Sequence, residues 1–143
     1  MHPLDEYFRN CLYFSAGALS RAMGRMAEEE FAGLGFSPSH AFLLMLVLEN
    51  PGASQKELGA ALHLAPSTVT RFVDAMERKG FMRRKSESRT ALIYPTAKGE
   101  ALGPEMEKAW NRLYKRYCAI LGQEEGDALS ERIFLANQKL AQG

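Results

Sequence analysis

The most constraining feature of this 143-residue chain is an amphipathic helix, residues 66–79, placed between a short turn and a pair of extended segments. Pro66 suits the first helical position, where its missing N–H needs no partner, and Gly80 ends the helix. A shorter helix, residues 54–62, precedes it and begins with the capping-box pattern Ser-x-x-Glu at Ser54. This order predicts a helix-turn-helix unit.

The segments that follow the second helix are rich in apolar and aromatic residues. They span residues 81–85 and 90–95, with the short charged stretch 86–88 between them. Two such segments around a short turn indicate a β-hairpin. A hairpin directly after a helix-turn-helix predicts a wing.

The helix at 66–79 has two distinct faces. Steps of three and four residues place its large apolar side chains on one face: Val69, Phe72, Val73 and Met76. The opposite face carries Ser67, Thr70, Arg71 and Asp74. Arginine binds guanine through two parallel hydrogen bonds, so this polar face suits the major groove of double-stranded DNA. A solvated helix in a small bundle would show a similar pattern, whereas a protein-binding surface would carry aromatic residues or leucines there.

Charge is concentrated in the same part of the chain. Residues 66–89 contain seven basic and three acidic residues, a net charge of +4, while the whole chain carries only +1. A local basic surface on a nearly neutral protein is typical of a phosphate-facing site, although solvated helix faces also show it.

Three further segments carry apolar stripes at helical spacing: residues 4–26, 98–121 and 124–141. A winged unit of about sixty residues cannot cover all three, so we expect a homodimer with these helices in the interface. The predicted fold class is mainly α with a small β-hairpin wing.

The remaining features point to a globular chain without catalytic apparatus. No apolar run reaches the ~18 residues of a membrane span, and residues 1–6 lack the basic start of a signal peptide, so we expect a cytoplasmic protein without membrane contact. Cys11 and Cys118 form no CxxC pair, and the histidines show no metal-ligand spacing to them. We expect no catalytic residues, metal or cofactor, and an enzyme is the least favoured class.

Residues 37–99 resemble the MarR (multiple antibiotic resistance regulator) family. The resemblance rests on four segments: residues 55–59 (QKELG), 64–71 (LAPSTVTR), 72–81 (FVDAMERKGF) and 96–99 (TAKG). The flanking helices also follow in the family's order and length.

The resemblance implies a homodimer that binds a palindromic operator, usually represses a promoter, and often releases DNA when a small aromatic molecule binds. It also implies three parts: an N-terminal dimerisation helix at 1–36, a winged helix-turn-helix domain at 37–97, and C-terminal dimerisation helices at 98–143.

The wing departs from the family pattern of acid-Arg-Arg at its tip. Glu87 and Arg89 keep the outer acid and arginine, but Ser88 replaces the middle base, and the turn after Arg84 is about three residues shorter than is common in the family. We therefore expect Arg89 to contact DNA less deeply than a longer wing would.

The candidate site residues fall into two groups. The predicted DNA-binding residues are Ser54, Gln55, Lys56, Pro66, Ser67, Thr68, Thr70, Arg71, Asp74, Arg84, Lys85 and Arg89. The predicted ligand-binding residues, each of which also suits plain core packing, are Phe14, Phe42, Met45, Trp110 and Tyr114.

A redox-sensing regulator of the same fold is the alternative function. Some family members sense hydroperoxides through a cysteine in the first helix, where Cys11 lies. A sensing thiol needs exposure and nearby donors or cations, whereas Cys11 falls on the apolar stripe, which favours core packing.

Overall fold

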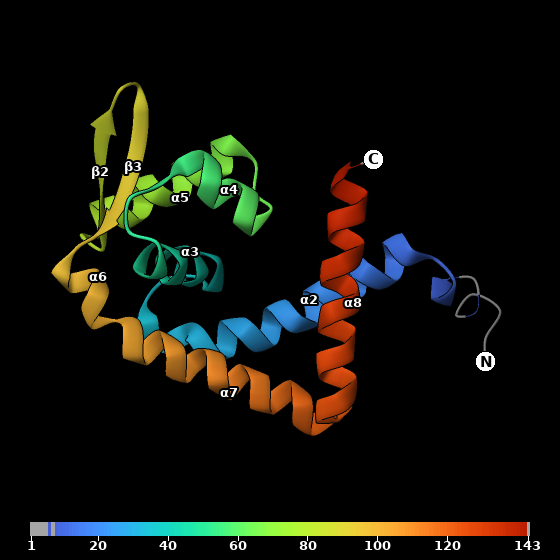
Figure 1. The fold of residues 1–143 in the computed structure, drawn as a ribbon. Helices are drawn as coiled ribbons and strands as arrows, with labels where there is room; N and C mark the ends of the chain where they lie inside the picture. Colours follow the sequence, from blue (N-terminus) through green and yellow to red (C-terminus); the bar gives the residue numbers. More distant parts are fainter. Residues whose placement is uncertain (1–5, 7, 143) are drawn as a thin grey trace.

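The computed structural model describes residue 6 and residues 8–142, which form helices around one small sheet (Figure 1). The helices are α2 (Leu12–Phe31), the 3₁₀ helix η1 (Ala32–Leu34), α3 (Pro38–Glu49), α4 (Gln55–Leu62), α5 (Pro66–Arg78), α6 (Ala97–Ala101), α7 (Gly103–Leu121) and α8 (Gln123–Gln142). The strands are β1 (Ala53–Ser54), β2 (Met82–Glu87) and β3 (Thr90–Pro95). The predicted fold class, mainly helical with a hairpin wing, is confirmed.

Helices α3, α4 and α5 pack with the three strands into what we call the winged unit. Its core is closed: Leu58, Val73 and Met76 expose at most 1% of their surface. Because α3 is apolar on nearly all sides, it can lie at the centre of this unit, with Leu43, Leu44 and Val47 fully buried.

Strand β1 was not predicted. It pairs antiparallel with β3 through Ala53 opposite Ile93 and Ser54 opposite Leu92, which gives the sheet order β1-β3-β2. Two residues are too few to show an alternating pattern, so the sequence carries no periodic signal for this strand.

The hairpin turn lies later than the sequence predicts. Strand β2 continues through Glu87, which pairs with Thr90, so the loop consists of Ser88 and Arg89 alone. Both loop residues have positive φ, 48° and 72°, as a two-residue turn of the kind that matches strand twist requires. The predicted turn at 86–88 is therefore wrong, and Arg89 stands at the tip of the wing.

Two helices predicted as continuous are broken. The helix expected over residues 4–26 is interrupted at Cys11, which is extended (φ −103°), and residues 4, 5 and 7 lie outside the described residues. The Asn10 side chain donates to the Glu6 carbonyl oxygen at 3.1 Å, so it competes with helical backbone bonding at this point.

The helix expected over residues 98–121 is two helices, α6 and α7. Pro104 cannot donate a backbone hydrogen bond and would clash with the preceding turn inside a continuous helix. It is tolerated in the first turn of α7, directly after the junction at Leu102.

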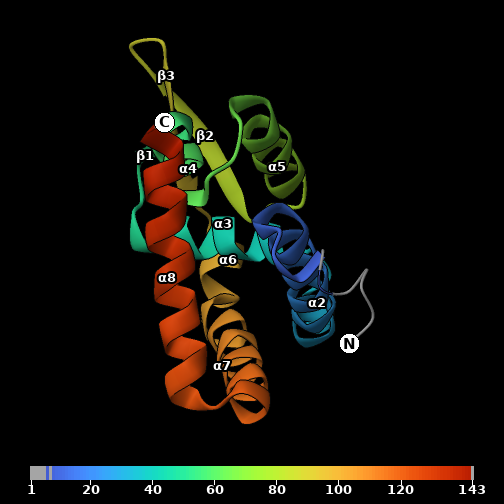
Figure 2. The same cartoon turned by 90° about the vertical axis from the view of Figure 1, so that its right-hand side faces the viewer.

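We call helices α2, α7 and α8 the arms. Helices α2 and α7 lie below the winged unit, whereas α8 turns back toward it, so that Ala141 near the end of α8 lines a hollow with residues of α4 and α5 (Figure 1). Helices α2 and α7 lie side by side, and α8 leaves the end of α7 at a steep angle (Figure 1). Figure 2 shows the winged unit above α7, with the wing pointing away from α7. No single helix of the described chain is long and apolar enough to span a membrane. Residues 12–34 and 38–49, taken together as a bent pair, have the length and composition that a span requires.

Candidate nucleic-acid interface

Helix α5 has the two faces that its sequence predicts. Val69, Val73 and Met76 are buried against the winged unit, while Ser67 and Arg71 are exposed on the other side. Phe72 was also predicted in the core. It is half-buried, and its ring packs edge-to-face against His40 of α3.

No described side chain caps the N-terminus of α5. Ala65 has extended φ and ψ but offers no side-chain acceptor, and Pro66 occupies the first helical turn. The first backbone amides of this helix therefore have no side-chain partner from residue 65, in contrast to α4, where Ser54 Oγ accepts from the Glu57 N–H at 3.1 Å. Ser54 is 9% exposed and serves as this cap.

Arg84 is held inside a network of acceptors. Its Nη2 lies 2.6 Å from Asp74 Oδ1, and its Nη1 lies 2.9 Å from Glu77 Oε1. Its Nε donates to Gln55 Oε1 at 2.8 Å, and its backbone N–H donates to Glu77 Oε2 at 2.9 Å. These contacts join β2 to α4 and α5, so the guanidinium is committed to fixing the helices and is 24% exposed.

The same network reaches the polar face of α5. Gln55 Nε2 donates to Thr70 Oγ1 at 3.2 Å, while that hydroxyl donates to the Pro66 carbonyl oxygen at 3.0 Å. Five predicted DNA-binding residues thus contact one another, and these contacts orient α5 on α4: Gln55, Pro66, Thr70, Asp74 and Arg84. Glu77, which also belongs to this network, was not among the predicted site residues.

Four predicted cations point into solvent: Lys56, Arg71, Lys85 and Arg89. Arg71 Nη2 makes one long contact with Thr68 Oγ1, 3.5 Å, and Arg89 stands at the wing tip. Arg83, which the sequence analysis left out, lies over the ring of Tyr94 with its guanidinium carbon 5.2 Å from the centroid. The exposed cations lie on α4, α5 and the wing, so the basic surface spans both the helix-turn-helix and the hairpin.

The predicted ligand-binding residues do not meet in one place. Phe14 packs on Phe8, with centroids 4.7 Å apart, whereas Phe42 packs on Phe31 at 5.8 Å. Among the described residues, no cavity is lined by all five predicted residues.

Two of the predicted ligand-binding residues do share a groove. Met45 and Trp110 line an open groove of about 530 Å³ between α3 and α7. Tyr114 stacks on Trp110, with centroids 6.0 Å apart, but its hydroxyl donates to Asp127 Oδ1 at 2.8 Å. This hydrogen bond, with a smaller desolvation effect, raises the pKa of Tyr114 to about 12, so the phenol stays protonated.

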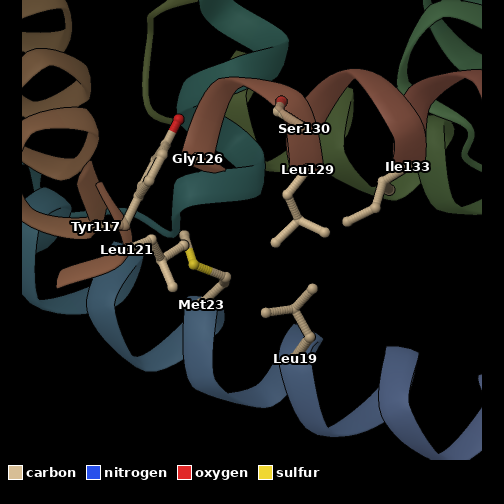
Figure 3. Close-up of a pocket in the computed structure, with 8 residues that line it drawn as sticks. All are labelled: Leu19, Met23, Tyr117, Leu121, Gly126, Leu129, Ser130 and Ile133. Atoms are coloured by element: carbon tan, nitrogen blue, oxygen red, sulfur yellow. The ribbon is translucent and has the colours of Figure 1, made fainter. Parts of the chain in front are cut away.

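A smaller cavity between the arms was not predicted. It has about 160 Å³, and Figure 3 shows Leu19 and Met23 of α2 facing Leu129 and Ile133 of α8 across it. Gly126 lies at its edge, where an added Cβ would come within 3.3 Å of Cys118 Sγ. Both cysteines are free thiols and half-buried, and Cys11 lies at the break before α2.

Comparison with known proteins agrees with this architecture. Residues 36–89 match the family model described as MarR family. The chain is 29% identical over 99 residues to the HTH-type transcriptional regulator TtmR of Methylorubrum extorquens (strain PA1), covering 67% of this chain and 51% of that protein. It is 30% identical over 95 residues to the HTH-type transcriptional repressor YetL of Bacillus subtilis (strain 168), covering 63% and 57%. The matches thus span little more than half the length of these two relatives.

Solved structures share the fold over most of the chain. The transcriptional repressor CouR bound to a 23-mer DNA duplex superposes with a TM-score of 0.84 at 21% identity, covering 93% of this chain and 96% of that one. CouR bound to p-coumaroyl-CoA gives 0.82 at 21% identity, covering 91% and 94%. The segment that matches the family model contains the predicted helix-turn-helix, strand β2 and the turn of the wing, whereas the solved structures share the fold of the arms as well. Residues 36–89, the greater part of the winged unit, therefore match the MarR family, and the described chain as a whole shares the fold of CouR.

Proposed function

We propose that this protein is a cytoplasmic transcription repressor that binds a palindromic DNA operator as a homodimer. A small molecule that binds the protein releases it from the DNA. The observation that carries the proposal is the exposed polar face of α5, with Ser67 and Arg71, next to a wing that ends in Arg89. A helix with this face suits the major groove, and the positive end of its dipole, which no described side chain caps, suits a phosphate.

The wing contributes through fewer residues than its sequence suggests. Lys85 and Arg89 are exposed and available to phosphates or to the minor groove. Arg84 is committed to Asp74 and Glu77, so we assign it, with Gln55, to positioning α5 rather than to contacting DNA. Because the loop has only two residues, the reach of the wing depends on Arg89 alone at its tip.

The homodimer is supported by the apolar surfaces of the arms. Leu12, Ile120 and Leu140 are 72%, 72% and 69% exposed, and further large apolar side chains lie on the same three helices. A second copy can cover these surfaces symmetrically, and a two-fold axis would place two α5 helices on successive turns of a palindromic site. In this proposal residues 1–36 and 98–143 form the dimer, and residues 37–97 bind DNA.

We propose the groove lined by Met45 and Trp110 as the site of the small molecule. This groove touches α3, at the centre of the winged unit, and α7, in the arms, so an occupant would contact both parts. CouR, which has the same fold, is a repressor whose structures hold DNA or p-coumaroyl-CoA.

Selection of genomic fragments by the purified protein tests the DNA-binding part of this proposal. We expect one enriched palindromic sequence, and Arg71→Ala should weaken binding to it by roughly 1–3 kcal/mol while relaxing base preference. Lys108→Ala, on α7, is the matched control and should bind like the wild type. Enrichment without any common sequence, or equal loss on all sequences in Arg71→Ala, would contradict sequence reading by α5.

A further inference from the structure

The groove between α3 and α7 combines an apolar floor with two acidic groups. It is lined by Met45, Leu48, Glu49, Gly103, Pro104, Glu107 and Trp110. On α3 the lining residues recur at steps of three and four, and on α7 they do the same, so one face of each helix forms one wall. The helices come close at Gly103, where an added Cβ would lie 3.7 Å from Leu48 Cδ1.

The charge of this lining has one sign. Glu49 and Glu107 are both exposed, and neither forms an ion pair within the described part of the chain. Glu105, on the same turn of α7 but outside the groove, pairs with Lys108 at 3.5 Å. The lining contains no lysine, arginine or histidine, so an anion would meet two carboxylates with no compensating cation.

Trp110 adds a second feature that favours positive charge. Trp110 lines the groove and is 42% exposed. Its indole also stacks on the ring of Tyr114, one turn further along α7. The face of an indole attracts cations, most strongly when the cation carries apolar groups and is weakly hydrated. The apolar area supplied by Met45, Leu48 and Pro104 suits the body of such a molecule, and the groove volume of about 530 Å³ lies in the range of pockets that bind drug-sized ligands.

From these features we infer that the effector of this groove is an organic cation with an apolar or aromatic body, such as a quaternary ammonium or phosphonium compound. The inference rests on the proposed function for the existence of an effector, and it adds the chemical class. Glu49 and Glu107 supply the charge selection, and Trp110 with Met45 supplies the apolar contact. The groove meets the chain where α6 joins α7, so an occupant contacts the connection between the winged unit and the arms.

The test uses tetraphenylphosphonium and tetraphenylborate, two ions of nearly the same shape and opposite charge. Trp110 is the chain's only tryptophan, so its fluorescence reports binding in the groove without DNA. We expect the cation to bind the wild-type protein at least tenfold more tightly than the anion. Glu49→Gln and Glu107→Gln should each weaken cation binding about fivefold, and the double variant more, while borate binding improves. Glu105→Gln is the matched control and should leave both affinities unchanged.

Equal binding of the two ions to the wild type, or unchanged cation binding by the double Gln variant, would overturn the inference. A second measurement separates it from the proposed function: anisotropy of a labelled fragment from the genomic selection, with and without the cation. Selective cation binding without any DNA binding would refute the regulator and leave the groove chemistry standing. Specific DNA binding with no charge preference in the groove would refute the cationic effector alone.

Discussion

The winged unit and the arms both contain amphipathic helices, but the apolar faces of these helices differ in how far they are covered within one chain. In the winged unit, Val73 and Met76 are fully buried within one chain. In the arms, Ile120 and Leu140 expose 72% and 69% of their surface. The same sequence pattern thus serves an internal core in the winged unit, whereas in the arms it is divided between buried residues, such as Phe31 and Met106, and an external surface.

This difference separates two kinds of stability. Burial of apolar surface in the winged unit contributes to the free energy of unfolding of one chain, at about 25 cal/mol for each Å². The exposed surface of the arms contributes only when another molecule covers it. Substitutions of buried residues in the winged unit and of exposed apolar residues in the arms should therefore act on different equilibria.

Met76→Ala should produce the largest effect, because it opens a cavity in a closed core. We expect the free energy of unfolding to fall by about 2–5 kcal/mol, as measured by chemical denaturation. Ser67→Ala, on the exposed face of the same helix, should change it by less than about 0.5 kcal/mol. A loss below about 1 kcal/mol in Met76→Ala would show that the core of the winged unit is loosely packed.

The double variant Ile120→Ser and Leu140→Ser should act on assembly instead. Losing two large apolar side chains from the proposed interface should raise the dimer dissociation constant at least about 100-fold, measured by sedimentation. The unfolding signal of the winged unit should stay in place at concentrations where the variant is monomeric. Lys115→Ser, an exposed change on the same α7, is the control. An unchanged dissociation constant would remove these two positions from the interface.

Arg84→Gln and Arg89→Gln should differ although both lie in the hairpin. Removing Arg84 leaves Asp74 and Glu77 without their cation, so we expect a loss of about 1 kcal/mol in stability. Removing Arg89 should leave stability unchanged and reduce the salt dependence of DNA binding by about one phosphate contact. The reverse outcome, a salt slope that responds to Arg84 but not to Arg89, would return Arg84 to the DNA surface.

The parts of the fold that the sequence predicts are those with local signals. The faces of α5 follow from helical spacing, and its bounds follow from Pro66 and Gly80. The breaks at Cys11 and Leu102 were missed because the apolar stripe continues across them and the breaking contacts are single side chains. Pro104 offered a signal that the sequence analysis could have used.

The candidate site was harder to predict because its role depends on contacts between distant segments. Arg84 meets Gln55 from 29 residues away, and no local pattern distinguishes such a guanidinium from one that faces DNA. The ligand-binding residues were chosen for aromatic and apolar character, which core residues share, so only Met45 and Trp110 line the same groove. Glu49 and Glu107 were not considered because carboxylates on helices are usually solvated.

The smallest predicted effect is a pH dependence that belongs to the winged unit alone. His40 on α3 lies against Phe72 of α5, with centroids 4.4 Å apart, and its Nδ1 is 3.1 Å from Ser37 Oγ. Burial, with a smaller contribution from the charge of Lys79, lowers the pKa of His40 below its usual 6.5. The unfolded chain therefore takes up the proton first, so stability is complete above about pH 6.5 and declines as pH falls toward the folded-state pKa.

His40→Gln should flatten this decline in denaturation experiments between about pH 7.5 and 5, while His63→Gln, which leaves His40 in place, should keep it. The sedimentation behaviour of the folded protein over the same range should not follow His40, because the ring packs between α3 and α5 rather than on the arms. A decline that persists in His40→Gln would move the titrating group elsewhere. A dimer dissociation constant that changed with His40 would show that the winged unit and the arms are coupled through α3, and would weaken the separation of the two equilibria.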